Sequence, residues 1–274
     1  MRYVWIALLL LATSVTALTY LSASGDDDDR RPLRVFAAAG LRRALEPAAA
    51  YERQTGQAVE LHWGGTGALY GQIKAGAACD VFLPGDTWTA QRGTADGLLT
   101  EATPVATQRP ALAVASGNPK QIVAWRDLLR EDVTVSMADP DQAATGRAVR
   151  EALGADRWEQ LRARVKVLKP TVADSAADVQ LGAADAAFVW DHMASGPSAW
   201  PGLELIELVE PALPAEAVMV AVPSSSGREE AREFATWLSR PDGQSYFAAA
   251  GFGLSDATSY GAVTVSGGRG QARE

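Results

Sequence analysis

Hydrophobic positions along the chain fall into short continuous runs that alternate with longer segments of helical spacing. The first series places strands at residues 33–37, 58–63 and 80–83, with helices at 41–54 and 69–75 between them. Short apolar runs bounded by glycine or polar residues predict buried strands, whereas apolar positions three and four apart predict helices. This order predicts a mainly parallel sheet covered by helices.

A second series of the same kind follows, and then one strand and two helices. Its strands are predicted at 111–115, 134–138, 165–168 and 186–190, its helices at 122–129, 146–153 and 176–181, and the closing elements at 217–222, 228–238 and 241–249. Two series predict an α/β protein of two lobes, each built on a doubly wound sheet. The closing elements are expected to return to the first lobe, with chain crossings near residues 106–111 and 213–217.

The N-terminus has the features of an export signal. Arg2 precedes an apolar run from residue 3 to about 21, and Ser22 and Ser24 suit a cleavage site. The run is also long enough to span a bilayer, so an uncleaved anchor is the alternative. The sequence therefore predicts a signal peptide or anchor at 1–24, an acidic linker at 25–32 and an extracytoplasmic body. The glycine-rich end, 263–274, predicts a disordered tail.

Composition and charge exclude several classes of partner. Hydrophobic residues make up 47% of the chain, which is enough for a proper core, and Cys79 is the only cysteine, so the body has no internal disulfide. The flanking sequence of Cys79 predicts a small buried side chain rather than a reactive thiol. The net charge of −8 argues against nucleic acid or an anionic membrane surface as the main partner. Any anionic ligand must therefore be attracted by local donors.

Three predicted strand-to-helix turns consist of small residues, at 37–41, 64–69 and 143–147. Small side chains let backbone N–H groups approach a ligand, and helix N-termini favour anions. Ligands of open α/β sheets bind outside the carboxyl ends of the strands. Thr66 and Thr145 add hydroxyl groups to two of these turns. The alternative is that these threonines only cap their helices.

Five segments carry a family resemblance. They are Val-Phe-Ala-Ala-Ala-Gly-Leu at 35–41, Gly-Gly-Thr-Gly-Ala-Leu at 64–69, Gln-Ile-Lys-Ala-Gly-Ala-Ala-Cys-Asp-Val-Phe-Leu at 72–83, Ala-Asp-Pro with Thr-Gly-Arg within 138–147, and Gly-Ala-Ala-Asp-Ala-Ala-Phe-Val-Trp at 182–190. In this order they resemble the periplasmic molybdate-binding proteins. The resemblance implies the type II periplasmic-binding fold, with a ligand cleft between lobe 1 (33–107 and 214–262) and lobe 2 (108–213).

The resemblance also implies a monomer that captures molybdate or tungstate and delivers it to an ABC permease, with no cofactor and no metal other than that of the ligand. The implied ligand-binding residues are Ala39, Gly40, Thr66, Gly67, Gly85, Thr145, Val172 and Trp190. The family pattern has serine where this chain has Gly40 and tyrosine where it has Trp190, and Pro84-Gly85 replaces Ser-Ala. The indole N–H of tryptophan donates a hydrogen bond but cannot accept one.

The sequence does not determine which oxyanion is bound. Molybdate, tungstate and sulfate are fully ionised near neutral pH and need donors only, whereas phosphate keeps a proton and benefits from an acceptor. Asp86, Asp174 and Asp191 lie near the implied loops and are expected to be caps or salt-bridge partners, although one pointing inward would favour phosphate. The matched loops supply no lysine or arginine, so neutral dipoles are expected to stabilise the anion, and Arg147, just inside its helix, is the nearest exception.

The sequence also bears on two other functional classes. An enzyme is disfavoured because His62 and His192 are the only histidines and no nucleophile elbow, Walker loop or metal-spaced cluster occurs. A membrane-tethered oxyanion sensor, held through the apolar N-terminus, uses the same binding site, so the sequence leaves it open.

Overall fold

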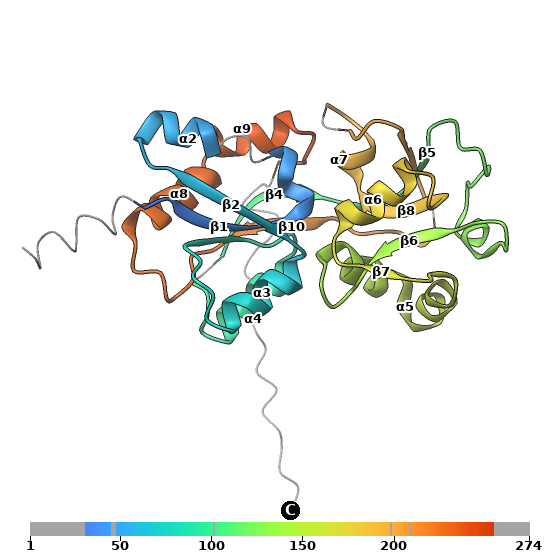
Figure 1. The fold of residues 1–274 in the computed structure, drawn as a ribbon, viewed down its shortest axis with the longest axis horizontal. Helices are drawn as coiled ribbons and strands as arrows, with labels where there is room; N and C mark the ends of the chain where they lie inside the picture. Colours follow the sequence, from blue (N-terminus) through green and yellow to red (C-terminus); the bar gives the residue numbers. More distant parts are fainter. Residues whose placement is uncertain (1–30, 45–47, 101, 198, 209, 255–274) are drawn as a thin grey trace, which may run out of the picture.

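The computed structural model describes residues 31–44, 48–100, 102–197, 199–208 and 210–254 (Figure 1). The signal or anchor at 1–24, nearly all of the linker and the tail at 263–274 lie outside the described residues. No helix of the described part is long and apolar enough to cross a membrane.

Lobe 1 contains a parallel three-stranded sheet extended by an antiparallel pair. The strands are β1 (Leu33–Ala38), β2 (Val59–Gly64), β3 (Val81–Leu83), β4 (Thr103–Gln108) and β10 (Glu216–Val220). The sheet order is β2-β1-β3, β10 pairs with β4, and a bridge between Phe82 and Ala221 joins the two parts. All residues of β1 except Arg34 are buried, as expected of a central strand with both faces covered.

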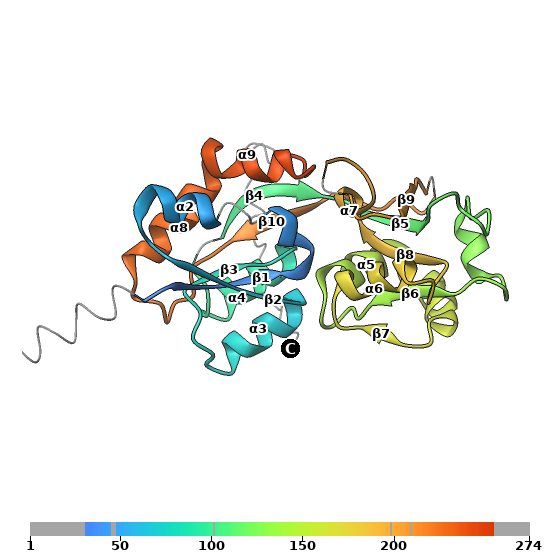
Figure 2. The same cartoon turned by 45° about the horizontal axis from the view of Figure 1, so that its top comes forward.

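Helices cover both faces of this sheet. They are η1 (Ala39–Ala44, a 3₁₀ helix), α2 (Ala48–Thr55), α3 (Thr66–Lys74), α4 (Thr87–Ala95), α8 (Glu229–Ser239) and α9 (Pro241–Ala249). Figure 2 shows α2, α8 and α9 on one side and α3 and α4 on the other. Phe234 and Phe247 from the C-terminal helices pack in one cluster with Val35 and Leu41, so the end of the described chain belongs to the core of lobe 1.

Lobe 2 is built on a five-stranded mixed sheet of order β7-β6-β8-β5-β9. Its strands are β5 (Pro110–Ala115), β6 (Val135–Ala138), β7 (Leu168–Lys169), β8 (Ala186–Trp190) and β9 (Leu203–Ile206), and its helices are η2 (Trp125–Leu129), α5 (Ala144–Arg164), α6 (Val172–Gln180) and α7 (Asp191–Ala194). Strand β6 is parallel to β7 and β8, whereas β5 is antiparallel to β8 and β9. Gly154, with φ 69°, kinks α5.

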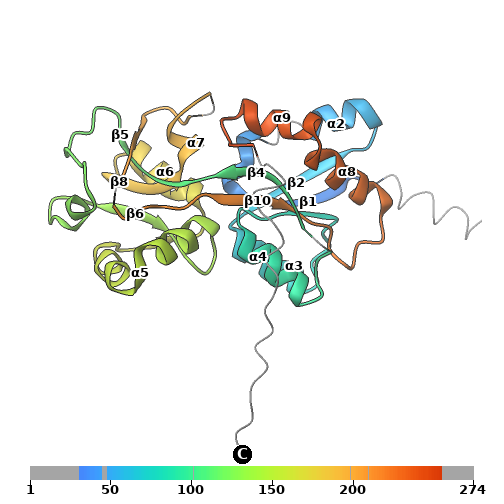
Figure 3. The ribbon, with the colours of Figure 1, turned by 180° about the vertical axis from the view of Figure 1, so that it is seen from behind.

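The chain passes between the lobes twice. It leaves lobe 1 between the end of β4 at Gln108 and the start of β5 at Pro110, and it returns before β10 begins at Glu216. Figure 3, seen from behind, shows β4 and β10 side by side where the two lobes join. The last residues of β1, β2 and β8, namely Ala38, Gly64 and Trp190, line one pocket between the lobes.

Some predicted elements differ from the structure in ways that affect the site. The helix predicted at 41–54 is divided into η1 and α2, with Pro47 between them in the sequence. Helices α4 and α7 and strands β4 and β9 were not predicted. Helix α4 has few apolar residues, and α7 and β9 are only four residues long. Helices α3, α5 and α6 each begin earlier than predicted, at Thr66, Ala144 and Val172. Their first turns consist largely of small residues, which give little hydrophobic periodicity.

Candidate ligand-binding site

A pocket lies between the lobes where the strands of both sheets end. We call it the ligand pocket. It is lined by Ala38, Ala39, Gly40, Gly64, Gly65, Thr66, Ala143, Ala144, Thr145, Thr171, Val172 and Trp190. Within the described residues, no charged side chain lines it. The pocket therefore offers backbone groups, three hydroxyls and one indole.

Three helices begin at the ligand pocket, α3 from lobe 1 and α5 and α6 from lobe 2. The residues before α3 and α5 are Gly65 and Ala143, which have no side-chain oxygen to cap the first-turn N–H groups. The first N–H groups of a helix have no partner inside the helix and carry partial positive charge. The dipoles of these helices therefore favour a negative charge in the ligand pocket, although none of the described residues that line it is ionised.

Two threonine hydroxyls face the ligand pocket from opposite lobes. Thr66 Oγ1 accepts a hydrogen bond from the Gly85 N–H at 3.1 Å, which leaves the hydroxyl proton free to be donated. Thr145 is 1% exposed, and its Oγ1 has no hydrogen-bond partner in the part of the chain that the structure describes. A buried hydroxyl without a partner is unfavourable. Its position in the pocket wall therefore points to an acceptor supplied by a ligand.

Trp190, at the end of β8, packs across the cleft against Gly40. A Cβ atom at Gly40 would stand 2.7 Å from Trp190 Cδ1, 3.0 Å from its Nε1 and 3.3 Å from a methyl group of Val172. A serine at residue 40 would therefore collide with this tryptophan. The two departures from the molybdate-binding pattern compensate each other, because glycine makes room for the larger ring.

Gly67 and Gly85 are not among the residues that line the ligand pocket, although the resemblance implies a binding role for both. The Gly67 N–H donates to the Gln142 carbonyl oxygen of lobe 2 at 2.8 Å. The Gly85 N–H donates to Thr66, and the Gly85 carbonyl accepts from the Gln108 side chain at 3.0 Å. Both N–H groups are thus engaged within the protein. The sequence could not show this, because Gln142 and Gln108 are distant in the chain.

Arg147 does not reach the ligand pocket but joins the lobes beside it. Its Nη1 lies 2.5 Å from Asp86 Oδ2 and donates to Thr89 Oγ1 at 2.9 Å, and the guanidinium lies 4.3 Å above the Trp88 ring. Asp86 Oδ1 also accepts from the Thr89 N–H and caps α4. Arg147 and Asp86 are both buried, and together they form an ion pair between the lobes.

The other two aspartates also have structural partners. Asp174 forms a capping box with Thr171 at the start of α6. Asp191 accepts from the backbone N–H groups of Arg109 at 3.2 Å and His192 at 2.9 Å. Asp86 therefore forms a cap and an ion pair and Asp174 a cap, whereas Asp191 binds two backbone N–H groups. None of the three is among the described residues that line the ligand pocket.

Two buried polar side chains, those of His192 and Gln108, lie at the first crossing between the lobes. His192 Nε2 lies 3.3 Å from Gln108 Oε1, and the imidazole stacks on Phe252 at a centroid distance of 3.7 Å. Burial lowers the pKa of His192 to about 3, so the ring is neutral at physiological pH. No sequence motif includes Gln108, and its location at the predicted crossing is its only signal in the sequence.

The ion pair between the lobes is expected to contribute to the free energy of unfolding. Arg147→Gln leaves the Asp86 carboxylate buried without its cation, so we expect the free energy of unfolding to fall by about 3–5 kcal/mol. Urea unfolding would measure this. Arg150→Gln, on the same helix, removes an exposed pair with Asp141 and should cost less than about 1 kcal/mol. Equal effects of the two variants would contradict the structural role of the buried pair.

The Glu216 carboxyl is expected to make the stability of the fold depend on pH. Burial raises the pKa of its carboxyl from 4.5 to about 7, and the carboxylates of Asp86 and Glu151 add to this, against Arg147 and the Thr87 N–H. A carboxyl that binds its proton more tightly in the folded protein stabilises the fold at low pH, and this contribution is lost as pH rises from about 4.5 to 7.

We therefore expect Glu216→Gln to unfold at higher urea concentration than the parent above pH 7. The variant should also lose the decline in stability between about pH 5 and 7. Glu52→Gln, at an exposed residue of α2, is the control and should keep the parent's pH profile. A Glu216→Gln profile parallel to the parent's would show that this carboxyl does not titrate there.

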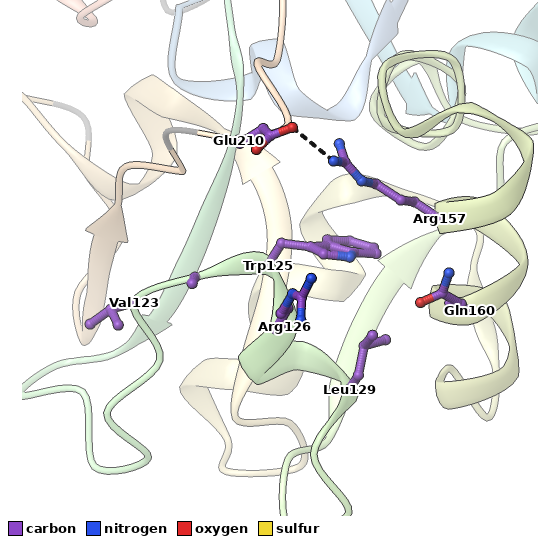
Figure 4. Close-up of a pocket in the computed structure, with 8 residues that line it drawn as sticks. Val123, Trp125, Arg126, Leu129, Arg157, Gln160 and Glu210 are labelled. Carbon is purple, nitrogen blue, oxygen red and sulfur yellow. Dashed lines mark hydrogen bonds and ion pairs between the residues drawn. The ribbon is translucent and has the colours of Figure 1, made fainter.

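Another cavity, of about 780 Å³, lies in lobe 2 away from these strand ends (Figure 4). Trp125 and Leu129 line it together with Arg126, and Arg157 and Glu210 form an ion pair of 2.9 Å at its edge. It contains no strand end or helix N-terminus from lobe 1. Among the described residues, no cluster of three or more histidine, cysteine or acidic side chains could hold a metal ion.

A fold of two α/β lobes joined by two crossings, with helix N-termini meeting in the cleft, defines a solute-binding protein. The chain belongs to the bacterial extracellular solute-binding proteins, whose family model matches residues 33–253. This family binds solutes and is not enzymatic. The type II periplasmic-binding fold and the family expected from the sequence are both confirmed.

Individual relatives agree with this assignment. A binding protein of Haemophilus influenzae is 26% identical over 89% of this chain and 97% of its own length. The molybdate-binding protein ModA of Mycobacterium bovis is 30% identical over 48% of this chain and 53% of its own length, so that match spans about half of each.

Two solved structures show the same fold. The periplasmic molybdate-binding protein of Azotobacter vinelandii has a TM-score of 0.64 at 24% identity and covers 81% of this chain and 99% of its own. The sulfate-binding protein SubI of Mycobacterium tuberculosis has a TM-score of 0.69 at 19% identity, with coverages of 82% and 87%. At these identities the likeness concerns the fold alone.

Proposed function

We propose that this protein binds a fully ionised tetrahedral oxyanion, molybdate or tungstate, in the ligand pocket and delivers it to an ABC permease. The observation that carries the proposal is the buried Thr145 hydroxyl, which faces a pocket of neutral donors and has no partner among the described residues. The proposed ligand set is Ala39, Gly40, Thr66, Thr145, Val172 and Trp190. Gly67 and Gly85 are not part of this set, because their N–H groups donate to Gln142 and Thr66.

The chemistry of the pocket favours an anion without a proton. A dianion such as molybdate only accepts hydrogen bonds, and dipoles at helix N-termini can stabilise its charge without a cation. Phosphate near neutral pH carries a proton and favours a site with a carboxylate acceptor. The neighbouring carboxylates of Asp86, Asp174 and Asp191 are engaged elsewhere. Sulfate also only accepts hydrogen bonds, so binding measurements must distinguish it from molybdate.

We further propose that residues 33–107 with 214–262 and residues 108–213 move as two bodies about the crossings. Opening would separate Thr66 and Gly40 from Thr145 and Trp190, which exposes the pocket to solvent. Closing would restore the buried donors around the anion. A signal peptide or anchor at 1–24 would place the protein outside the cytoplasm, where either a permease or a sensor domain could read the closed state.

Calorimetry of residues 25–274 with molybdate, tungstate, sulfate and phosphate tests the proposal. We expect molybdate and tungstate to bind at least about tenfold more tightly than sulfate, a difference of 1.4 kcal/mol, with phosphate the weakest. Tighter binding of phosphate, or binding of none of the four, would overturn the proposal. Preferential binding of sulfate would retain the oxyanion class but change the ligand.

Trp190 is expected to donate its indole N–H to the bound anion. Trp190→Phe keeps a buried ring against Gly40 but removes the indole N–H, so molybdate affinity should fall by about tenfold. The melting temperature of the unliganded protein should change little, because the packing is nearly retained. Titration calorimetry and thermal unfolding measure the two quantities. Parent-like affinity in Trp190→Phe would show that the indole N–H does not contact the anion.

A further inference from the structure

A second cavity borders the ligand pocket along Ala39 and Gly40. We call it the outer cavity. It has a volume of about 230 Å³ and is lined by Ala39, Gly40, Arg42 and Arg43 of lobe 1 and by Gln180, His192 and Trp200 of lobe 2. Because both cavities share Ala39 and Gly40 as a wall, an anion in the outer cavity would lie next to the ligand pocket.

The charge of the outer cavity differs from that of three other cavities. The described residues that line it include two arginines and none that is acidic, and His192 is neutral. The three other cavities contain cations together with acidic residues: Glu210 in one, Asp80, Glu229 and Glu230 in another, and Asp96, Asp141 and Glu151 in the third. The chain as a whole has a net charge of −8, so a cavity with two arginines differs from its average surface.

Both guanidinium groups lie near aromatic rings. Arg42 lies 5.5 Å from the centre of the Trp63 ring, and Arg43 lies 5.9 Å from that of Trp200. Arg43 also donates to the Ala199 carbonyl of lobe 2 at 2.9 Å. The contact of Arg42 with Trp63 lies within lobe 1 and does not depend on closure, and the planar fork of a guanidinium matches the oxygen atoms of an oxyanion.

We propose that the outer cavity is a second anion site, at which an oxyanion is held by Arg42 and Arg43 before it enters the ligand pocket. This inference rests on the proposed function of the ligand pocket. The overall negative charge repels a dianion, and the neutral donors of the pocket act only at short range. A pair of cations at the edge of the cleft raises the local anion concentration and the association rate.

The location of the arginines supports this order of events. Arg42 and Arg43 belong to η1, the same segment of lobe 1 that begins with Ala39 and Gly40. When the lobes separate, these residues stay together on lobe 1, whereas Gln180, His192 and Trp200 move with lobe 2. The lobe 1 walls of the outer cavity and of the ligand pocket then form one continuous surface. The anion would need to move only along this short segment before lobe 2 closes over it.

Stopped-flow tryptophan fluorescence with molybdate tests the proposal. In Arg42→Gln/Arg43→Gln we expect the association rate at low ionic strength to fall by about tenfold. The difference should vanish near 1 M salt, where the Debye length is about 3 Å. Arg42→Lys/Arg43→Lys keeps the charge and should retain most of the rate.

A matched control removes the same charge from a distant cavity. Arg126→Gln/Arg157→Gln changes two arginines of the cavity in Figure 4 and should associate at the parent rate. An equal slowing of both glutamine pairs would show that only net charge matters and would overturn the outer site. Parent-like association of Arg42→Gln/Arg43→Gln would overturn it as well.

Direct observation of the arginines separates this proposal from the function of the ligand pocket. In NMR titrations with molybdate, the Nε–H signals of Arg42 and Arg43 should shift in the parent and in Thr145→Val, in which the ligand pocket is weakened. If calorimetry detects no tight binding but these signals shift, the proposed function fails and the outer site stands. If molybdate binds tightly and the signals do not move, the outer site is wrong.

Discussion

Gly65→Ala is expected to abolish tight ligand binding, with a loss of affinity of about a hundredfold or more. A Cβ atom at Gly65 would stand 2.3 Å from the Gln142 carbonyl oxygen and 2.6 Å from that of Pro170. Both oxygens belong to the backbone of lobe 2, so no side chain can turn away to relieve the collision. The lobes would have to remain apart, and the donors of lobe 2 would not reach the anion.

The change should be local to the contact between the lobes. We expect Gly65→Ala to keep the parent's secondary structure, and small-angle scattering should show no compaction when molybdate is added. Gly71→Ala is the matched control, because it lies on the same helix and a Cβ there would have no neighbour within 4 Å. That control should bind as the parent does and be more stable by about 0.5–1 kcal/mol. Tight binding and compaction in Gly65→Ala would contradict the closed arrangement of the lobes.

Thr66→Val and Thr145→Val are each expected to weaken molybdate binding by roughly ten- to a hundredfold. Each removes one hydroxyl that donates to a charged ligand, an interaction of about 1.5–3 kcal/mol, while keeping the shape of the side chain. The hydroxyls come from opposite lobes and would bind the same anion. The loss of binding free energy in the double variant should therefore differ from the sum of the losses in the two single variants. The difference measures the coupling between the two hydroxyls.

The unliganded proteins should behave differently. Thr66→Val also removes the acceptor of the Gly85 N–H, so its free energy of unfolding should fall by about 1–3 kcal/mol. Thr145→Val removes a hydroxyl that has no partner among the described residues, so the unliganded variant should be at least as stable as the parent. Calorimetry and thermal unfolding distinguish these outcomes. A Thr145→Val protein that is less stable but binds as the parent does would show a structural hydroxyl instead of a ligand donor.

The sequence by itself determined the class of fold and the region of the site. Buried strands such as β1 and β8 are apolar on both faces, and this property depends only on local composition. The small residues at 37–41, 64–69 and 143–147 indicated where strand ends meet helix starts, because parallel strands bring such turns to one edge of a sheet. Six of the implied residues, namely Ala39, Gly40, Thr66, Thr145, Val172 and Trp190, line one pocket.

The tertiary structure alone decided which donors remain free. Gly67 and Gly85 have the same residue type and local context as a ligand loop, yet Gln142 and Thr66 take their N–H groups. Arg147 is engaged by Asp86, and Gly40 is matched to the Trp190 ring of the other lobe. Each of these outcomes depends on a contact between residues that are far apart in the chain. Local pattern cannot specify such contacts, because they arise only when the two lobes pack together.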